Sequence, residues 1–181
     1  MTATRTAMPS LLTPRLCLRR PRMADARALT GLANDWEVAK QTASLPHPYH
    51  LTDAKAWIAT ASDEIRFVVE RRGGAPIGAL RLREREDRFG IGYWFGRRHW
   101  DQGFATEAVA AAVRHAFQEL GATKVAAGVF IENPASFRVL EKVGFTAIGV
   151  VERTLEHRGG QRRIRRFELT QGDLAETAPM P

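Results

Sequence analysis

Residues 91–145 constrain the fold more than any other part of this 181-residue chain, because they predict strands and helices in alternation. Residues 91–95 form a short apolar run rich in aromatic side chains, which favours a buried strand. Apolar residues then recur at three- and four-residue steps over 105–120, which predicts one apolar helix face. Gly121 follows directly, where a helix often ends in a left-handed residue. Alternation of this kind is typical of a mixed α/β sheet.

The second half of the same stretch repeats the pattern. Apolar and other residues alternate over 125–129, as in a strand. Asn133 and Pro134 then provide a helix N-cap and a proline at the first helical position, and Gly144 suits the end of that helix.

The rest of the chain predicts antiparallel hairpins and short helices around this stretch. Expected strands are 16–19, 65–70, 76–83, 89–95, 145–152 and 163–169, with turns at Gly73-Gly74 and Gly159-Gly160. Expected helices are 26–33 after Asp25, a possible one at 36–42, and one to about residue 62 capped by Thr52. We expect one domain over 1–181, with a core at about 13–170 and frayed ends at 1–12 and 171–181.

Charge and cysteine content limit the function classes. The net charge of +7 favours anionic partners such as nucleic acid, acidic peptides or the phosphates of a cofactor, although a solvated basic surface explains it equally well. The one cysteine, Cys17, excludes an internal disulfide and fits a reducing compartment, so we expect a cytoplasmic protein. No apolar run is long enough for a membrane span, and the first ten residues do not form a secretory signal.

A possible phosphate site lies where the long helix begins. Residues 100–105 read Trp-Asp-Gln-Gly-Phe-Ala, a loop with a glycine that leads directly into the helix N-terminus. Free backbone N–H groups and the positive end of the helix dipole meet there, which favours an anion. Many helices begin in this way, so the loop alone is a weak signal.

Three motifs together resemble the GNAT superfamily of acetyl-CoA-dependent N-acetyltransferases, and most closely its RimJ/RimL branch. They are Ile-Gly-Tyr-Trp-Phe-Gly at 91–96, Trp-x-x-Gly-x-Ala-Thr-Glu-Ala at 100–108 and Asn-Pro-Ala-Ser-x-Arg-Val-Leu-Glu-Lys-Val-Gly-Phe at 133–145. The resemblance extends over about 13–170. It implies a mixed sheet of about seven strands, splayed between the fourth and fifth, with about four helices. It also implies transfer of acetyl to a primary amine by direct attack in a ternary complex, with a ribosomal or other protein N-terminal α-amine as the expected acceptor.

The resemblance assigns the cofactor site to the central stretch. The backbone of Trp94 and Phe95 is expected to pair with the pantetheine arm of acetyl-CoA. The pyrophosphate is expected at the N–H groups of Gln102, Gly103, Phe104, Ala105 and Thr106, where Gly103 allows close approach because it has no Cβ. Nearby cations either meet phosphates or form solvated surface; they are Arg97, Arg98, Arg138 and Lys142.

Catalysis is expected at the start of the second helix. Most of the superfamily places a tyrosine seven residues after the asparagine, but this chain has Leu140 there. In the resembled branch a serine contacts the sulfur, and Ser136 stands at that position; its alternative role is to pair with the helix backbone. Asn133 is expected to cap the helix and to bind the pantetheine arm. Related sequences often carry a glutamate as base where this chain has Gly90, so the base is not identified.

The acceptor is expected to contact the irregular segment 34–49 and the loop 154–163, because such loops vary with substrate. Candidate substrate-binding residues are Trp36, His47, Tyr49 and Tyr93. The histidines do not cluster with cysteine or acids at metal-ligand spacing, so we expect no metal. The sequence leaves monomer and homodimer open.

Two other functions remain open at this stage. One is acetylation of a small amine such as a polyamine, an antibiotic or an amino acid. The other is a non-catalytic, basic, ribosome- or RNA-associated module that binds acyl-CoA. The sequence lacks RNA-stacking aromatics within a basic strand, which counts against nucleic acid as a substrate. It also lacks a Gly-x-Gly-x-x-Gly after a strand, which excludes a dinucleotide site of that type.

Overall fold

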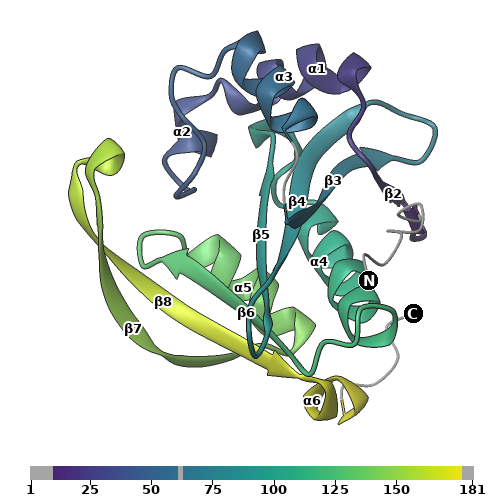
Figure 1. Ribbon diagram of the computed structural model, residues 1–181, viewed down its shortest axis with the longest axis vertical. Helices are drawn as coiled ribbons and strands as arrows, with labels where there is room; N and C mark the ends of the chain where they lie inside the picture. Colours follow the sequence, from purple (N-terminus) through teal and green to yellow (C-terminus); the bar gives the residue numbers. More distant parts are fainter. Residues whose placement is uncertain (1–9, 61–62, 177–181) are drawn as a thin grey trace, which may run out of the picture.

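Eight strands form one mixed sheet with helices on both faces (Figure 1). The computed structural model describes residues 10–60 and 63–176. The strands are β1 (Leu11–Leu12), β2 (Leu16–Arg19), β3 (Glu64–Arg71), β4 (Pro76–Glu84), β5 (Phe89–Phe95), β6 (Lys124–Phe130), β7 (Thr146–Leu155) and β8 (Gly160–Thr170). The helices are α1 (Ala26–Ala33), α2 (Trp36–Ala39), α3 (Leu51–Ala59), α4 (Phe104–Gln118), α5 (Pro134–Val143) and α6 (Gln171–Glu176), with short 3₁₀ turns η1 (Met23–Asp25), η2 (Arg97–His99) and η3 (Glu156–Arg158). The predicted mixed α/β fold is confirmed.

The sheet opens between β5 and β6, the one parallel pair among the described strands. Its order is β1-β2-β3-β4-β5-β6-β8-β7, and every other neighbouring pair is antiparallel. β5 and β6 pair only at Phe89 with Val125 and at Gly90 with Ala126. Beyond these positions each strand pairs on its outer side alone, with β4 or with β8. The predicted splay is therefore confirmed. It lies between the fifth and sixth strands and not between the fourth and fifth, because the two-residue strand β1 comes before the strands that were predicted.

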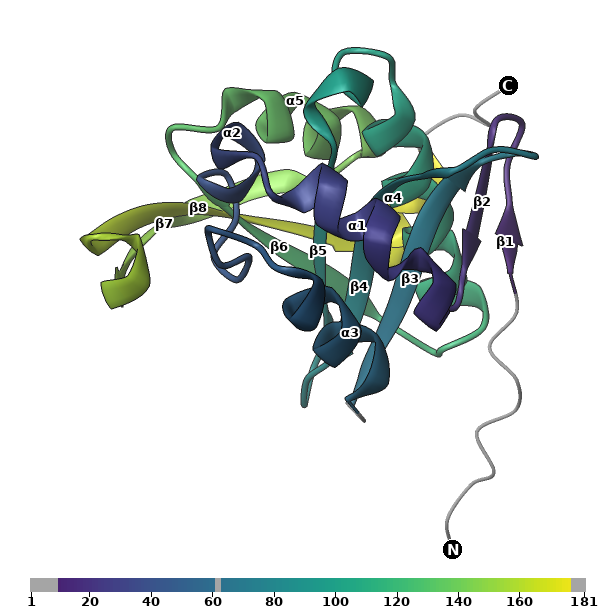
Figure 2. The ribbon, with the colours of Figure 1, turned by 90° about the horizontal axis from the view of Figure 1, so that it is seen from above.

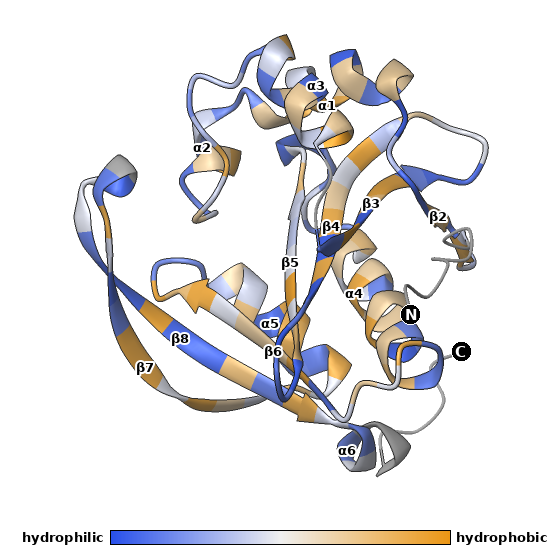
Figure 3. Ribbon diagram, viewed as in Figure 1, coloured by the Kyte–Doolittle hydropathy of each residue, from blue (hydrophilic) through white to orange (hydrophobic). Residues whose placement is uncertain are grey.

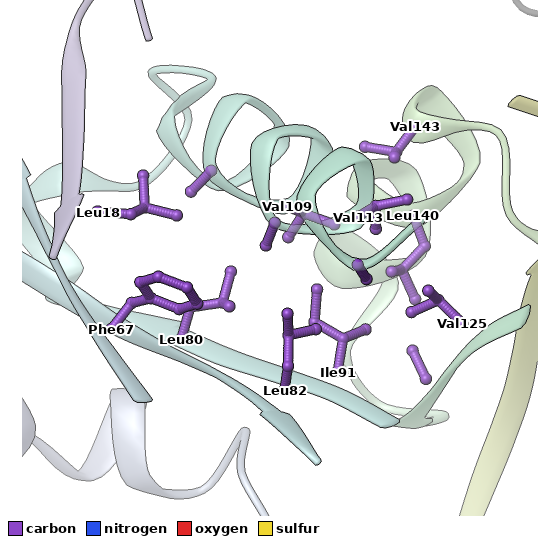
Figure 4. Close-up of a cluster of buried hydrophobic side chains, with 14 of the residues drawn as sticks. Leu18, Phe67, Leu80, Leu82, Ile91, Val109, Val113, Val125, Leu140 and Val143 are labelled. Carbon is purple, nitrogen blue, oxygen red and sulfur yellow. The ribbon is translucent and has the colours of Figure 1, made fainter. Parts of the chain in front are cut away.

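Alternation along the strands divides the side chains between two hydrophobic cores. On β3, Phe67 belongs to the core under α4 and α5, whereas its neighbour Val68 belongs to the core under α1, α2 and α3. Each fully buried aliphatic or aromatic side chain contributes about 1.5–3 kcal/mol relative to an exposed one. The α4–α5 core therefore fixes both helices on the sheet beside the opening; Figure 4 shows its members Leu18, Phe67, Leu80, Leu82, Ile91, Val109, Val113, Val125, Leu140 and Val143.

Local backbone signals set the ends of the two helices that border the opening. Gly103 stands at the N-cap of α4 with a φ of +76°, and Gly144 ends α5 with a φ of +106°. The Asn133 side chain accepts a hydrogen bond from the Ser136 N–H at 3.1 Å, and Pro134 is the first residue of α5. These features confirm the helix boundaries predicted at 133 and 144, because each depends only on residues close in sequence.

The structure corrects the prediction of frayed ends. Residues 11–12 pair with β2, and residues 171–176 form α6. α6 begins where the Asp173 carboxylate accepts hydrogen bonds from the N–H and the hydroxyl of Thr170, at 3.1 and 2.6 Å. This cap satisfies a free donor at the start of the helix. The other predicted frayed residues, 1–9 and 177–181, lie outside the described residues.

Two further helix boundaries differ from the prediction. α3 begins at Leu51 and not after Thr52, because the Asp53 carboxylate accepts the His50 N–H at 2.7 Å and fixes the turn into the helix there. The described part of α3 ends at residue 59, and the last part of its predicted span, 61–62, is not described. α2 stops at Ala39, since Thr42 caps the following turn through its hydroxyl.

β7 and β8 form a hairpin longer than the sequence predicts. Figures 1 and 2 show it extending away from the rest of the sheet to a tip at η3. Gly159 and Gly160 turn the chain at the tip with φ values of +78° and +100°. The turn predicted at these two glycines is confirmed.

A buried ion cluster joins β2, β3 and the start of α1. Arg19 donates to both carboxylate oxygens of Asp25 at 2.8 Å, and it lies 2.7 Å from Glu70. Asp25 precedes α1 as predicted, but its carboxylate does not cap that helix; it accepts the Arg22 N–H at 2.7 Å instead. Burial alone raises the pKa of Asp25, but the hydrogen bonds from Arg19 and Arg22 outweigh it and hold the pKa below its usual value.

Asp25→Asn should lower the free energy of unfolding by about 2 kcal/mol, because it leaves the buried Arg19 with one carboxylate instead of two. The depressed pKa stabilises the fold above the unfolded pKa of about 4, and this contribution is lost as the pH falls through the folded pKa. In urea unfolding between pH 3 and 7, the free energy of unfolding of the variant should therefore fall less steeply toward low pH than that of the unmodified protein. Glu37→Gln, which breaks the exposed pair with Lys40, is the control; an equal loss in both variants would contradict the assignment.

Candidate active site

A cavity of about 1010 Å³ occupies the opening between β5 and β6. Its walls come from both sides of the sheet. On one side lie the first turns of α4 and α5; on the other lie the loop after α2, part of α3 and charged residues of β3 and β4. A ligand that binds on the helix side can therefore contact a second ligand that enters from the opposite side, through the gap in the sheet.

The start of α4 forms a cradle of backbone N–H groups on the helix side. Gly103 has a left-handed φ of +76°, and no side chain caps the helix at this point. A Cβ on Gly103 would lie 3.3 Å from Nη2 of Arg15. Phe104, Ala105 and Thr106, the first residues of α4, line the cavity. Uncapped N–H groups with no Cβ in front of them fit a phosphate group.

Arg15 holds the loop before α4 in place, and the sequence prediction missed it. Its Nη1 donates to the carbonyl of Gln102 at 2.9 Å, and its Nε donates to Glu107 at 2.6 Å. The Thr13 hydroxyl donates to the same carboxylate at 2.6 Å. Burial raises the pKa of Glu107, but these hydrogen bonds and the charge of Arg15 outweigh it, so the pKa lies below its usual value. The contacts join residues more than 80 positions apart, which no local pattern reveals.

Asn133 and Ser136 are hydrogen-bonded to each other at the start of α5. The Asn133 amide donates to Oγ of Ser136 at 3.0 Å, while its oxygen accepts the Ser136 N–H at 3.1 Å. Oγ of Ser136 is the acceptor in this bond, so the hydroxyl proton stays available for another group. Both residues line the cavity.

Tyr93 reaches the same helix turn from β5. Its hydroxyl donates to the carbonyl of Ser136 at 3.5 Å. Burial raises its pKa to about 12, so the phenol is protonated at neutral pH. Leu140, where the wider superfamily has a tyrosine, is fully buried in the core and does not face the cavity.

The predicted cofactor residues fall into two groups. Trp94, Phe95, Arg138 and Lys142 line the cavity. Arg97 and Arg98 line a smaller hollow beside α1 instead. Gln102 is also outside the lining, and its side chain donates to the Arg98 carbonyl at 2.9 Å.

The predicted substrate residues also separate. Tyr49 is buried and lines the cavity, and burial beside Asp53 raises its pKa to about 12. Trp36 and His47 contact each other as tilted rings, with centroids 5.4 Å apart and an interplanar angle of 52°, outside the cavity lining. Tyr93 lines the cavity from the α5 side, away from the other three.

Arg158, at the tip of the β7–β8 hairpin, supports the loop that forms part of the cavity wall. It donates to the carbonyls of Thr42 and Leu45, both in the loop after α2. Arg158 is buried, and this burial lowers its pKa. Thr42 and Leu45 line the cavity, so the distant hairpin supports that loop. The sequence prediction placed both segments near the acceptor but gave no contact between them.

The carboxylates that line the cavity are Asp53, Glu64 and Asp101. Asp53 accepts the His50 N–H, and Glu64 pairs with Arg66, Arg81 and Arg83. Asp101 stands on the α4 side with a φ of +57°. At Gly90 a Cβ would meet only the Arg83 carbonyl, 3.8 Å away. The sequence prediction did not find the Glu64 cluster, which alternation along two separate strands could have indicated.

The structure also bears on membranes and metals. None of the described helices is long and apolar enough to cross a bilayer. Within residues 10–60 and 63–176, His, Cys, Asp and Glu do not come together in a group of three that could hold a metal ion.

Sequence comparison identifies the family. Residues 15–146 match the model of the acetyltransferase (GNAT) domain. The uncharacterized N-acetyltransferase YoaA of Bacillus subtilis is 31% identical over 160 residues, which cover 83% of this chain and 90% of YoaA.

Solved structures share the fold. A GNAT-family acetyltransferase from Bacillus anthracis superposes with a TM-score of 0.82 at 21% identity, over 91% of this chain and 99% of the other. RimJ of Mycobacterium smegmatis, solved with CoA-disulfide, gives 0.78 at 26% identity over 89% and 84%. Spermidine N-acetyltransferase of Vibrio cholerae, solved with CoA and spermine, gives 0.77 at 22% over 91% and 100%. With the open sheet and the N–H cradle of α4, these matches place the chain in the GNAT acetyltransferase family, as an acetyl-CoA-dependent N-acetyltransferase.

Proposed function

We propose that the acceptor is the α-amine at the N-terminus of a protein or peptide, and that it attacks acetyl-CoA directly in a ternary complex. The observation that carries this is the absence of a carboxylate at the position of Gly90, together with the engagement of Asp53 and Glu64 by other groups among the described residues. Of the other titratable groups in the lining, His99 accepts a hydrogen bond from Nε of Arg98 through its Nε2 at 3.1 Å, and Asp101 stands on the α4 side, beside the N–H cradle. The resemblance of the three sequence motifs to the RimJ/RimL branch supports the same class of acceptor.

The argument rests on the cost of a neutral amine. Only the unprotonated amine attacks a thioester. A lysine ε-amine has a pKa of about 10.4 and an α-amine one of about 7.7–8.0. Deprotonation at pH 7 therefore costs about 4–5 kcal/mol for the first and about 1 kcal/mol for the second. A site without a dedicated base is therefore better suited to the α-amine.

The residues of this chain fit acetyl-CoA, which supplies the activated acetyl group. In the proposed arrangement the backbone of Trp94 and Phe95, on the free edge of β5, binds the pantetheine arm. The N–H groups at residues 102–106 bind the pyrophosphate, and Arg138 and Lys142 stand within the cavity to meet further phosphate charge. Arg97 and Arg98 lie outside the lining and are less suited to this role.

Ser136 is proposed to stabilise the sulfur as it gains negative charge. The Asn133 amide donates to Oγ of Ser136 and so fixes this side chain. Because Oγ is the acceptor in that bond, the hydroxyl proton of Ser136 can be directed at the cavity. A hydrogen bond to a charged group is worth about 1.5–3 kcal/mol. Asn133 acts as a positioning residue in this account, in addition to capping α5.

The acceptor class is tested with two peptides that each carry one reactive amine. One has a free N-terminus and no lysine; the other has a blocked N-terminus and one lysine. At pH 7 the first should have a kcat/KM at least about tenfold higher, and the gap should narrow toward pH 10 as the ε-amine loses its proton. Equal kcat/KM values at pH 7 would show that the site deprotonates lysine and would reject the proposal.

Gly103→Val should weaken coenzyme A binding by at least about tenfold, because its Cβ would crowd Nη2 of Arg15, which holds the loop before α4, and because a branched side chain strains a φ of +76° at the N–H cradle. Gly121→Val is the matched control, since Gly121 has a φ of +69° at the other end of α4 and no cavity contact. Calorimetric titration of coenzyme A measures both. Equal affinities in the two variants would move the phosphate site elsewhere.

Ser136→Ala should lower kcat by about tenfold or more while the Kd for coenzyme A changes little, since the lost hydrogen bond forms mainly as charge develops on sulfur. Thr146→Ala, which removes an exposed hydroxyl from the start of β7 and lies outside the cavity lining, is the control. Unchanged kcat in Ser136→Ala would leave Ser136 with a structural role only.

A further inference from the structure

Four charged side chains form a cluster on the side of the cavity away from α4 and α5. Glu64 and Arg66 come from β3, and Arg81 and Arg83 from β4; all four line the cavity. Figure 3 shows hydrophilic stretches within these central strands. We call this set the Glu64–arginine cluster.

The cluster lies on the sheet face opposite α4 and α5. Its members alternate with Ile65, Phe67, Leu80 and Leu82, which pack in the core under those helices. Successive side chains of a strand point to opposite faces of the sheet. The cluster is therefore separate from the cradle at the start of α4 and does not serve the phosphates of coenzyme A.

Three guanidinium groups share one carboxylate. Oε1 of Glu64 lies 2.8 Å from Nη1 of Arg81 and 2.7 Å from Nη2 of Arg83, and Oε2 lies 3.3 Å from Nε of Arg66. The cluster therefore has a surplus of positive charge. Holding like charges together at a half-buried site is costly unless a further anion offsets them.

Arg66 is committed to the structure. It donates to the carbonyls of Trp57 and Thr60 at the end of α3, and its guanidinium lies 5.5 Å from the Trp57 ring centroid. Its side chain is only 17% exposed. Arg66 therefore joins α3 to the sheet and is not free to bind a ligand.

Arg81 and Arg83 retain binding capacity. Their side chains are 38% and 37% exposed in the cavity wall, and each guanidinium has five N–H donors. Glu64 is their one ion-pair partner within residues 10–60 and 63–176. The buried Nε of Arg83 also has no hydrogen-bond partner in this part of the chain. Such incomplete pairing is unusual for a buried donor, and a bound ligand can supply the missing partner.

Two glycines on β5 leave these arginines uncovered. Gly92 pairs with Arg81, and Gly90 pairs with Arg83. A Cβ on Gly92 would lie 3.0 Å from Nε of Arg81, so the guanidinium stem crosses the space that a side chain would fill. β5 borders the opening, and neighbouring strands lie about 4.8 Å apart. One small molecule can thus place an anionic group at the two arginines and an amine, a few bonds away, in the opening.

We propose that Arg81 and Arg83 bind a carboxylate of the acceptor, so that the preferred substrate is an amine with a carboxylate a few bonds away. Paired guanidinium groups recognise carboxylates through parallel, charge-assisted hydrogen bonds. A polyamine is disfavoured, because the cluster repels its additional cationic groups. The carboxylate comes either from an acidic side chain near a peptide N-terminus or from the α-carboxylate of a free amino acid. The inference deepens the proposed α-amine function and rests on it.

Kinetics with matched acceptors test the proposal and its two sources. One pair is a peptide that begins Ser-Asp-Asp and its isosteric partner Ser-Asn-Asn; the other pair is alanine and alaninamide. The carboxylate member of at least one pair should have a kcat/KM about tenfold higher, as expected for charged hydrogen bonds. A preference in the first pair identifies an acidic N-terminus, and one in the second identifies an amino acid. No preference in either pair, or a preference for spermidine over every carboxylate acceptor, overturns the inference.

Variants with opposite expected effects separate recognition from folding. Arg81→Gln and Arg83→Gln should each reduce the carboxylate preference severalfold, whereas Glu64→Gln should keep or increase it because the guanidinium groups lose their competing carboxylate. Arg85→Gln, on the exposed turn after β4 and outside the cavity, is the control. Thermal unfolding and coenzyme A affinity confirm that each variant folds. A parallel loss of preference in Glu64→Gln and Arg81→Gln would assign the cluster a structural role and overturn the inference.

Binding without turnover distinguishes failure of this inference from failure of the proposed function. N-acetylated Ser-Asp-Asp and Ser-Asn-Asn peptides cannot react, so calorimetry on the complex with coenzyme A reports recognition alone. Preferential binding of the acidic peptide, lost in Arg81→Gln, supports the inference even if no α-amine is acetylated. Acetylation of α-amines with equal binding of both blocked peptides overturns the inference and leaves the proposed function intact.

Discussion

The separation of β5 from β6 after two paired residues is the constraint on which the rest of the site depends. Each strand is fixed on its outer side, β5 by β4 and β6 by β8, so the two inner edges keep their backbone groups free of one another. Buried backbone groups require partners, and an extended ligand that enters the gap can supply them. The same gap joins the two faces of the sheet, so the helix side and the loop side share one cavity.

The features that the sequence predicted are those that depend on neighbouring residues. Gly103, Asn133 and Gly144 mark helix ends through their own backbone or side-chain properties, and each boundary is confirmed. The aromatic run of β5 and the periodicity of α4 are local in the same sense. The family resemblance then connected these local patterns to an open sheet, and the strand pairing confirms the opening.

The parts that escaped prediction depend on contacts between distant residues. Arg15 meets the loop before α4 across 87 positions, and no spacing rule relates the two. The Glu64–arginine cluster requires the register of β3 with β4 before its members come together. From the sequence, Gly90 indicates only that a base is missing. In the folded chain the Arg81 side chain crosses the space that a side chain at position 92 would fill, and Gly90 pairs with Arg83 without covering it.

Arg158 bears on how this enzyme could change its choice of acceptor. The wall that it supports consists of two segments more than 110 residues apart, joined by hydrogen bonds from one side chain to two carbonyls. Because the hydrogen bonds of Arg158 go to main-chain carbonyls, the side chains of the loop after α2 can be replaced without loss of these bonds. The bonds do not involve α4, α5 or the opening between β5 and β6. Selectivity for the acceptor can thus evolve by substitution in this loop while the acetyl-donor half of the enzyme remains as it is.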